Sequence, residues 1–100
     1  MDDFQRHAVQ IFKALADPTR YEIVKLLVER GEMGCGDFDE AFPHSKSAMS
    51  HHYRILENAQ LIKTRKVGQH VRITAQHATL KRFLPGFKNA HIKAVAKQKT

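Results

Sequence analysis

Residues 45–59 restrict the fold most, because they alternate between an apolar and a cationic side at helical spacing. Ser45 is the expected N-cap of this helix. The apolar side consists of Met49, Tyr53, Ile55, Leu56 and Ala59. The opposite side carries cations and short hydroxyls, and we find no acid on it: Lys46, Ser47, Ser50, His51 and Arg54. Such a face suits the DNA major groove, where cations meet phosphates or guanine edges, whereas an ordinary surface helix usually mixes both signs of charge.

Charge is segregated along the chain. Residues 1–43 contain 5 Lys/Arg and 9 Asp/Glu, whereas residues 44–100 contain 12 Lys/Arg and a single acid, Glu57. A basic half of this kind favours a polyanionic partner, because each neutralised phosphate releases condensed counterions. A membrane surface is the alternative anion, but the basic half lacks one long helix with a broad apolar face.

Length and cysteine content indicate a small intracellular domain. One hundred residues make a single domain, 1–100, with a modest core that oligomerisation often supports. No apolar run is long enough to span a bilayer, and the acidic start is the opposite of a signal peptide. The single cysteine excludes an intrachain disulfide and fits a reducing compartment, so we expect a cytoplasmic protein.

Two helices are expected before the basic half. Apolar residues mark an amphipathic helix that closes near Ala16. Asp17 then serves as N-cap and Pro18 takes the first position of a second helix, where its missing N–H costs nothing. Gly31 ends that helix.

A third, short helix is expected before residue 45. Residues 34–36, Gly-Cys-Gly, are interpreted as an extended turn. Asp37 is then the expected N-cap of a helix over residues 38–42. Pro43 stops that helix.

A hairpin and a broken helix complete the pattern. Strand-like residues 61–67 and 70–74 flank Gly68-Gln69, which is typical of a tight turn. Pro85-Gly86 should kink or split the helix that follows. Its apolar positions are Leu80, Phe83, Leu84, Phe87, Ala94 and Val95. The predicted fold is therefore mainly α with one small β-hairpin, in the α+β class.

This order resembles a winged helix–turn–helix, and the chain resembles the ArsR/SmtB family of small dimeric repressors from about Phe12 to Thr74. The matching segments are FKALADPTRYEIVKLL, GEMGCGDFDEAF, SKSAMSHHYRILENAQLI and KVGQHVRIT. The resemblance implies a homodimer that binds an inverted-repeat operator in double-stranded DNA and represses transcription. It also implies a helix–turn–helix at 37–59, a wing at 61–74, and dimerisation helices at 1–16 and 76–100.

The expected contact residues follow from this scheme. The helix at 45–59 would enter the major groove, and the hairpin tip would reach the backbone or minor groove. The DNA-binding residues are expected to be Ser45, Lys46, Ser47, Ser50, His51, Arg54, Arg65, Lys66, Gln69, His70 and Arg72. The dimer interface is expected to use apolar side chains that a winged helix cannot cover alone: Phe4, Ile11, Leu80, Leu84 and Phe87.

The chain departs from the family at its metal sites. Metal-sensing relatives carry a Cys-Val-Cys-Asp box, but here glycines occupy both thiolate positions, Gly34 and Gly36. Ala75 and Ala94 interrupt the carboxylate/histidine set of the last helix. We therefore expect no regulatory metal and no cofactor. The alternative is a metal- or thiol-responsive repressor that uses Cys35 or histidines, including a bridge between two Cys35 residues of a dimer.

The lone thiol and the histidines have ordinary structural interpretations. Cys35 has no neighbouring cation, and Asp37 would oppose thiolate formation, so a small buried hydrophobe is expected. His52 should be a hydrogen-bonded residue at the core edge, and His44 lies at the turn into the helix. The histidines near the chain ends are expected at the solvated surface: His7, His77 and His91.

Two other function classes fit less well. An enzyme would need an oriented base, and no carboxylate is placed to orient the Ser50-His51 pair. The chain also lacks a Gly-rich phosphate loop and paired catalytic carboxylates, so we expect no enzymatic activity. A winged helix used for protein–protein contact would usually lose the cations of the 45–59 helix.

Overall fold

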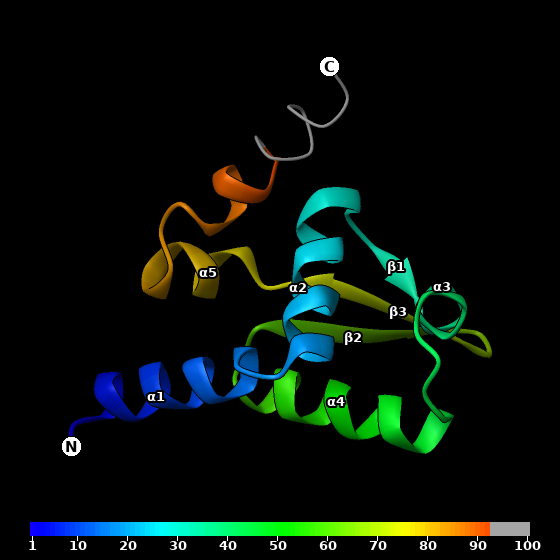
Figure 1. Ribbon diagram of the computed structural model, residues 1–100, viewed down its shortest axis with the longest axis horizontal. Coiled ribbons are helices and arrows are strands. Elements are labelled where there is room, and N and C mark those ends of the chain that lie inside the picture. Colours follow the sequence, from blue (N-terminus) through cyan, green and yellow to red (C-terminus); the bar gives the residue numbers. More distant parts are fainter. Residues whose placement is uncertain (93–100) are drawn as a thin grey trace.

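The computed structural model describes residues 1–92 of the chain. Five helices and three strands make up the fold, followed by helical residues 87–92 (Figure 1). The helices are α1 (Asp3–Leu15), α2 (Pro18–Arg30), α3 (Cys35–Ala41), α4 (Lys46–Asn58) and α5 (His77–Phe83). The strands are β1 (Met33–Gly34), β2 (Ile62–Val67) and β3 (His70–Ala75). This is the winged helix architecture, and the predicted α+β class is confirmed.

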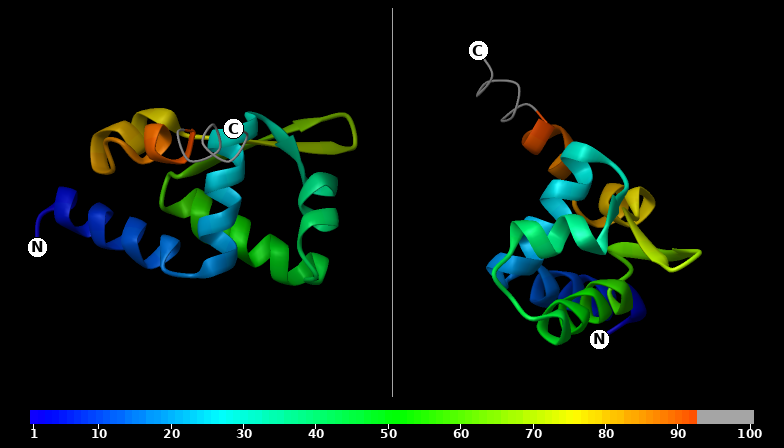
Figure 2. Two further views of the ribbon diagram at one scale, coloured as in Figure 1. Left: turned by 45° about the horizontal axis from the view of Figure 1, so that its top comes forward. Right: turned by 90° about the vertical axis from the view of Figure 1, so that its right-hand side faces the viewer.

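The sheet is antiparallel, with strand order β1-β3-β2. The hairpin pairs Ile62 with Ala75 at its base and Val67 with His70 at its tip. Gly68 turns the chain with φ of 62°, a left-handed value that a residue without Cβ adopts at little cost. The hairpin extends beyond the helices as the wing (Figure 2). The predicted hairpin is confirmed.

Strand β1 was missed in the sequence, where residues 34–36 were interpreted as a turn. Met33 pairs with Ile73 and Gly34 with Arg72, so β1 is a two-residue strand. Its partner lies about forty positions further along the chain, and no local alternation of side chains can reveal such a pairing. Strand β1 therefore places the turn after α2 against the wing.

A single core lies where α1, α2, α4 and the sheet meet. Helix α2 contacts both β3 and α4, and α4 packs on β2. The largest fully buried side chains are Phe38, Ile11, Ile23, Leu27, Met49, Leu56, Leu61, Ile62, Ile73 and Val24. Burying one such side chain contributes roughly 1.5–3 kcal/mol. Met49 and Leu56 therefore fix α4 firmly against the sheet.

The predicted helix ends are largely confirmed. The Asp17 carboxylate accepts from the Arg20 amide at 3.0 Å, and Pro18 occupies the first position of α2. Gly31 ends α2 with φ of 82°. Ala16 is the C-cap of α1, as expected.

The prediction for α3 was wrong by three residues at its start. Helix α3 begins at Cys35, with Gly34 as N-cap, and not after Asp37. Asp37 occupies the third helical position, and its carboxylate accepts from the Gly34 amide at 2.8 Å. This is the returning half of a capping box, so Asp37 signalled a helix start that lies before it.

The predicted break in the last helix is confirmed. Helix α5 ends at Phe83, Gly86 adopts φ of 95°, and residues 87–92 are helical again. The Tyr21 hydroxyl of α2 lies 2.7 Å from His91 Nε2, which fastens this last stretch to the body. Ala94 and Val95 lie outside the described residues. Among residues 1–92, no helix has the length and apolarity needed to cross a bilayer.

Candidate nucleic-acid interface

Helix α4 is fixed at its N-terminus and along its apolar side. The Ser45 hydroxyl accepts from the Ala48 amide at 3.1 Å, so this residue caps the helix as predicted. Met49 and Leu56 are buried beneath it. Tyr53 and Ile55 pack at the edge of the same core. Only one side of α4 remains available for a partner.

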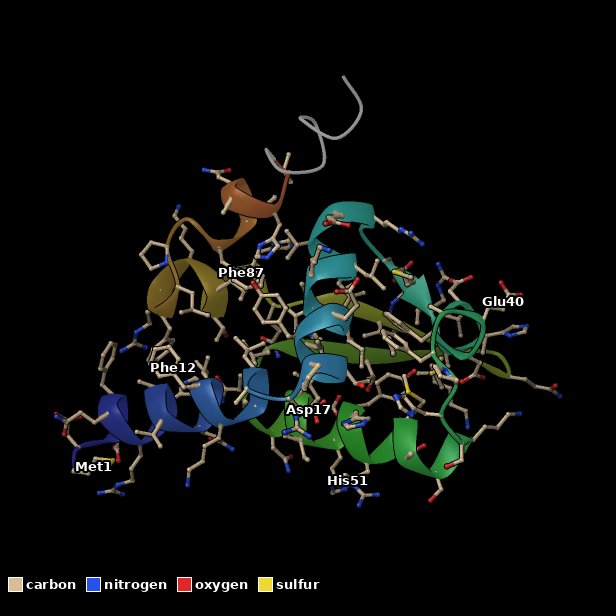
Figure 3. The ribbon with its side chains drawn as sticks, in the orientation of Figure 1. Met1, Phe12, Asp17, Glu40, His51 and Phe87 are labelled. Atoms are coloured by element: carbon tan, nitrogen blue, oxygen red, sulfur yellow. The ribbon has the colours of Figure 1, made fainter. Side chains whose placement is uncertain are left out.

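That available side contains every helix residue predicted to contact DNA. Lys46, Ser47, Ser50, His51 and Arg54 are all exposed. His51 projects from the outer face of the helix (Figure 3). Short hydroxyls between longer cations leave room for close approach to base edges. The structure thus brings these five side chains together on one solvent-facing surface.

Glu57 is the acid that the sequence analysis overlooked on this surface. It is exposed and lines one groove together with Ser50 and Arg54. Its Oε2 accepts from the Thr64 hydroxyl at 2.7 Å and from the Thr64 amide at 3.3 Å. Glu57 therefore fastens α4 to the wing through one of its two carboxylate oxygens.

The wing presents its predicted contact residues on two different faces. Side chains alternate along a strand, and Arg65 pairs with Arg72, so these two arginines share one face. Lys66 pairs with Val71 and lies on the face of Thr64, which points toward α4. The wing therefore adds Lys66 to the side that borders α4 and directs both arginines the other way.

Glu32, after α2, holds both arginines. Its carboxylate lies 2.7 Å from Arg65 Nη2 and 3.5 Å from Arg72 Nε. The hydrogen bond from Arg65 is the largest influence that lowers the pKa of Glu32, and the charges of Arg65 and Arg72 lower it further. This pairing could not be predicted from the sequence, because Glu32 lies 33 residues before Arg65. Arg65 and Arg72 thus already have an anionic partner within the protein.

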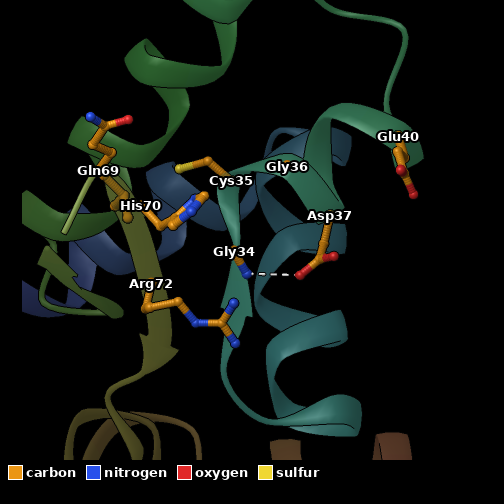
Figure 4. Close-up of a pocket in the computed structure, with 9 residues that line it drawn as sticks. Gly34, Cys35, Gly36, Asp37, Glu40, Gln69, His70 and Arg72 are labelled. Carbon is orange, nitrogen blue, oxygen red and sulfur yellow. Dashed lines mark hydrogen bonds between the residues drawn. The ribbon is translucent and has the colours of Figure 1, made fainter. Parts of the chain in front are cut away.

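The wing tip borders a groove of about 440 Å³ against the start of α3 (Figure 4). Gln69 and His70 line it from the wing, and Asp37 and Glu40 line it from α3. Both Gln69 and His70 are exposed. His70 therefore shares its groove with two carboxylates, whereas the opposite face of the wing borders α4.

The Asp-Pro-Thr-Arg turn between α1 and α2 supports α4 from behind. Arg20 Nε donates to the Ala14 carbonyl at 2.7 Å, and its Nη1 lies 3.3 Å from His52 Nδ1. Burial opposes ionisation of Asp17, but the Arg20 amide and guanidinium outweigh it and hold the pKa of Asp17 below its ordinary value. This network gives the motif a structural role.

His52 is the core-edge residue that the sequence predicted. Burial, followed by the charge of Arg20, lowers its pKa below 6.5, although Asp17 acts in the opposite direction. A neutral ring can accept the Arg20 hydrogen bond at Nδ1. His44 was missed as a structural residue, since its Nε2 lies 3.1 Å from the Thr19 hydroxyl.

Cys35 is half-buried beside α4 and not fully enclosed as predicted. Burial is the main influence that raises the pKa of the thiol, and the nearby Asp39 carboxylate raises it further. Asp39, and not Asp37, is the acid that opposes thiolate formation. The thiol is therefore a poor nucleophile and a poor ligand in this setting.

Two histidines predicted at the solvated surface are instead engaged. His7 Nε2 lies 2.8 Å from the Ala59 carbonyl. His91 packs on Phe87 and contacts Tyr21. His77 is exposed, as expected. Within residues 1–92, no three His, Cys, Asp or Glu side chains converge in a way that could hold a metal ion.

The apolar surface expected for dimerisation differs from the prediction at two positions. Ile11 is 0% exposed and Leu80 is 3% exposed, so both belong to the core of the single chain and their assignment to the interface was wrong. Phe4 is 48% exposed, as expected, and Phe12 adds a 58% exposed ring on the same helix. Leu84 and Phe87 are half-buried against the core.

Known proteins are similar to this chain in sequence and in architecture. The family model for the bacterial regulatory protein, arsR family, matches residues 17–64. Transcriptional repressor SdpR of Bacillus subtilis is 44% identical over 61 residues, which are 61% of this chain and 67% of SdpR. YceK of the same species, an HTH-type transcriptional regulator, is 37% identical over 79 residues, or 78% of this chain and 79% of YceK.

A solved structure is also similar to this chain in its fold. HlyU from Vibrio cholerae N16961 superposes with a TM-score of 0.68 at 28% identity, covering 84% of this chain and 98% of HlyU. SdpR and YceK are transcriptional regulators, and regulators of this kind are not enzymes. With its exposed cationic helix and wing, the chain is a DNA-binding transcriptional regulator that belongs to the ArsR family.

Proposed function

We propose that the protein is a homodimeric repressor that binds an inverted-repeat operator with α4 in the major groove. The observation that carries this proposal is the solvent-facing side of α4, where Lys46, Ser50 and Arg54 stand together. Arginine recognises guanine edges, and short hydroxyls permit close approach to the bases. Lys66 on the neighbouring wing face supplies a phosphate contact.

A second copy of the chain is the partner that fits α1. Phe4 and Phe12 are exposed on this helix, and the exposed side chain of Val9 extends the apolar surface. An apolar surface of this kind usually marks an interface. A two-fold dimer would set its recognition helices about 34–36 Å apart, one DNA turn, and would read an inverted repeat.

Repression in our proposal requires neither a metal nor a cofactor, and it takes place in the cytoplasm. Gly34 and Gly36 carry no ligand side chain, and the raised pKa of Cys35 disfavours its thiolate. Stoichiometric Zn²⁺ or peroxide should therefore leave the protein on its DNA, in the wild type and in Cys35→Ser alike. Release that disappears in Cys35→Ser would make the chain a metal or thiol sensor.

Selection from random duplexes tests the proposed function. We expect the full chain to enrich one inverted repeat from a library of duplexes. If a dimer makes roughly 6–10 phosphate contacts, its affinity should fall about 10³–10⁵-fold between 50 and 200 mM salt. A flat salt response, or no enriched sequence, would contradict the proposal.

A further inference from the structure

The C-terminal end of α4 receives two side chains from α1. The last carbonyl groups of a helix have no partner within the helix and must find one elsewhere. In α4 the Leu56 carbonyl accepts from the Leu61 amide at 3.0 Å, and the Glu57 carbonyl accepts from the Gln60 amide at 2.9 Å. Gln60 has φ of 61°, so the chain leaves α4 through a left-handed residue.

The next two carbonyl groups are bound by α1. Gln10 Nε2 donates to the Asn58 carbonyl at 3.2 Å. His7 Nε2 contacts the Ala59 carbonyl at 2.8 Å. Because a carbonyl only accepts, Nε2 of His7 must carry the proton, and both the neutral Nε2–H tautomer and the imidazolium satisfy this bond.

Helix α5 fixes the ring of His7 in this position. The ring meets Phe83 edge-on, with centroids 4.5 Å apart. Phe83 also stacks on Phe4 at 4.7 Å, and the Arg82 guanidinium lies over both phenylalanine rings. His7 therefore stands at a junction of α1, α5 and the end of α4.

Helix α1 also carries the surface proposed for dimerisation. Phe4 and Phe12 are exposed on α1, and Phe4 is also one of the rings that brace Phe83. If α1 shifted against the second copy of the chain, the His7 and Gln10 side chains that bind the α4 carbonyls would therefore move with it. Because α4 is one continuous helix, a shift at its C-terminal end would change how Ser50 and Arg54 meet the bases.

We infer that His7 and Gln10 are positioning residues for operator recognition, which set the angle of α4 from the dimerisation helix. The inference rests on the proposed function, because it assigns how the dimer determines the pose of the reading helix. Neither residue would touch DNA. Their loss should reduce discrimination between sequences more than it reduces binding to DNA in general.

Three variants of the full-length protein test this assignment. His7→Leu removes the donor and keeps an apolar side chain on Phe83, whereas His7→Gln retains a donor. Gln10→Met alters an exposed side chain, so it leaves the core intact. His77→Leu is the control, because it removes an exposed histidine of α5 and leaves the side chains of His7 and Gln10 in place.

The readout is the ratio of affinities for the selected inverted-repeat duplex and for a scrambled duplex of equal length. Sedimentation first establishes that each variant is dimeric. We expect His7→Leu to reduce the ratio about tenfold, the scale of one lost base contact, and Gln10→Met to reduce it by a smaller factor. His7→Gln should restore the ratio to near the wild-type value, and His77→Leu should not change it.

Three outcomes of these measurements would contradict the inference or the proposed function. An unchanged ratio in Gln10→Met and in dimeric His7→Leu would overturn the inference. Equal losses on both duplexes by a dimeric variant would overturn it too, because a positioning residue should affect recognition of the sequence more than binding to DNA in general. A wild-type protein without sequence preference would overturn the proposed function itself, which is distinguishable from failure of the variants alone.

Discussion

Single residues decide which cations of the wing can meet DNA. Glu32 contacts Arg65 at 2.7 Å and Arg72 at 3.5 Å, so both arginines have a partner within the protein. An exposed ion pair is weak, and a phosphate can replace the carboxylate. Glu32 therefore competes with DNA for these side chains and also repels the phosphates directly.

Glu32→Gln should consequently bind DNA more tightly. We expect about a two- to fivefold gain at low salt, on a selected and on a random duplex alike, and a smaller gain at high salt because screening weakens the removed repulsion. Fluorescence anisotropy at two salt concentrations measures it. Glu22→Gln removes the same charge from α2 and is the control. Weaker binding by Glu32→Gln would indicate that Glu32 orients the arginines toward DNA.

His52 makes stability depend on pH. Burial and the neighbouring cations lower its pKa below 6.5 in the folded chain, despite the opposing charge of Asp17. Above that pH both the folded and the unfolded chain carry a neutral ring. Below it the unfolded chain takes up a proton that the folded chain resists, so the free energy of unfolding decreases as the pH falls from about 6.5.

His52→Asn should make this pH dependence shallower. The Asn oxygen can accept the Arg20 hydrogen bond and does not titrate. One proton contributes at most about 1.4 kcal/mol per pH unit, which bounds the change in slope between pH 7 and pH 5. Urea denaturation at a series of pH values measures the slope. An identical slope in the wild type and His52→Asn would show that His52 does not cause the pH dependence.

At the scale of elements, the sequence predicted those helix ends that are determined by interactions within one helical turn. Ser45, Asp17 and Gly31 mark helix ends because their side chains or their φ angles act within one turn. Strand β1 escaped prediction because two residues carry no periodicity and their partner lies on β3.

In the candidate site too, residues placed by helical spacing were predicted and contacts that depend on the tertiary fold were not. The solvent-facing side of α4 follows from helical spacing alone. Glu57 falls on that side too, but its bond to Thr64 depends on how the hairpin folds back on α4. Ile11 was misassigned because an apolar stripe in a sequence does not reveal which of its members the chain itself covers.

The division of labour between α4 and the wing is testable. Arg54→Ala should reduce discrimination between selected and random duplexes by roughly 1–3 kcal/mol, because it removes a contact to base edges. Lys66→Ala should weaken binding to both duplexes about equally and reduce the salt slope by about 1. Anisotropy titrations of both variants on both duplexes measure these effects. The opposite pattern would mean that the wing reads the sequence and α4 contacts only the backbone.

At the scale of the whole molecule, two unlike surfaces coexist. Exposed cations lie along α4 and at Lys66 of the wing, whereas exposed aromatic rings lie along α1. The first surface suits a polyanion and the second suits another copy of the chain. Binding to an inverted repeat requires both surfaces at once, because one protomer covers one half-site.

A charge on the apolar surface should separate these two roles. Phe12 is 58% exposed, so Phe12→Asp should leave the protomer folded and disrupt the dimer. We expect a monomer in sedimentation at micromolar concentration, with wild-type circular dichroism and at least a hundredfold weaker binding to the inverted repeat, on the order expected when two linked sites act singly. Lys13→Asp alters the charge of the adjacent residue and is the control. A dimeric Phe12→Asp would show that α1 does not form the interface.

Protection of guanine N7 atoms on the selected duplex tests the central claim most directly. If α4 of each protomer enters a major groove, the bound protein should protect two clusters of N7 atoms about 10 base pairs apart. Arg54→Ala should lose guanine protection within each cluster while it still covers the backbone between them. Backbone protection without any N7 protection, or a single protected cluster, would contradict the account in which a dimer reads DNA with α4.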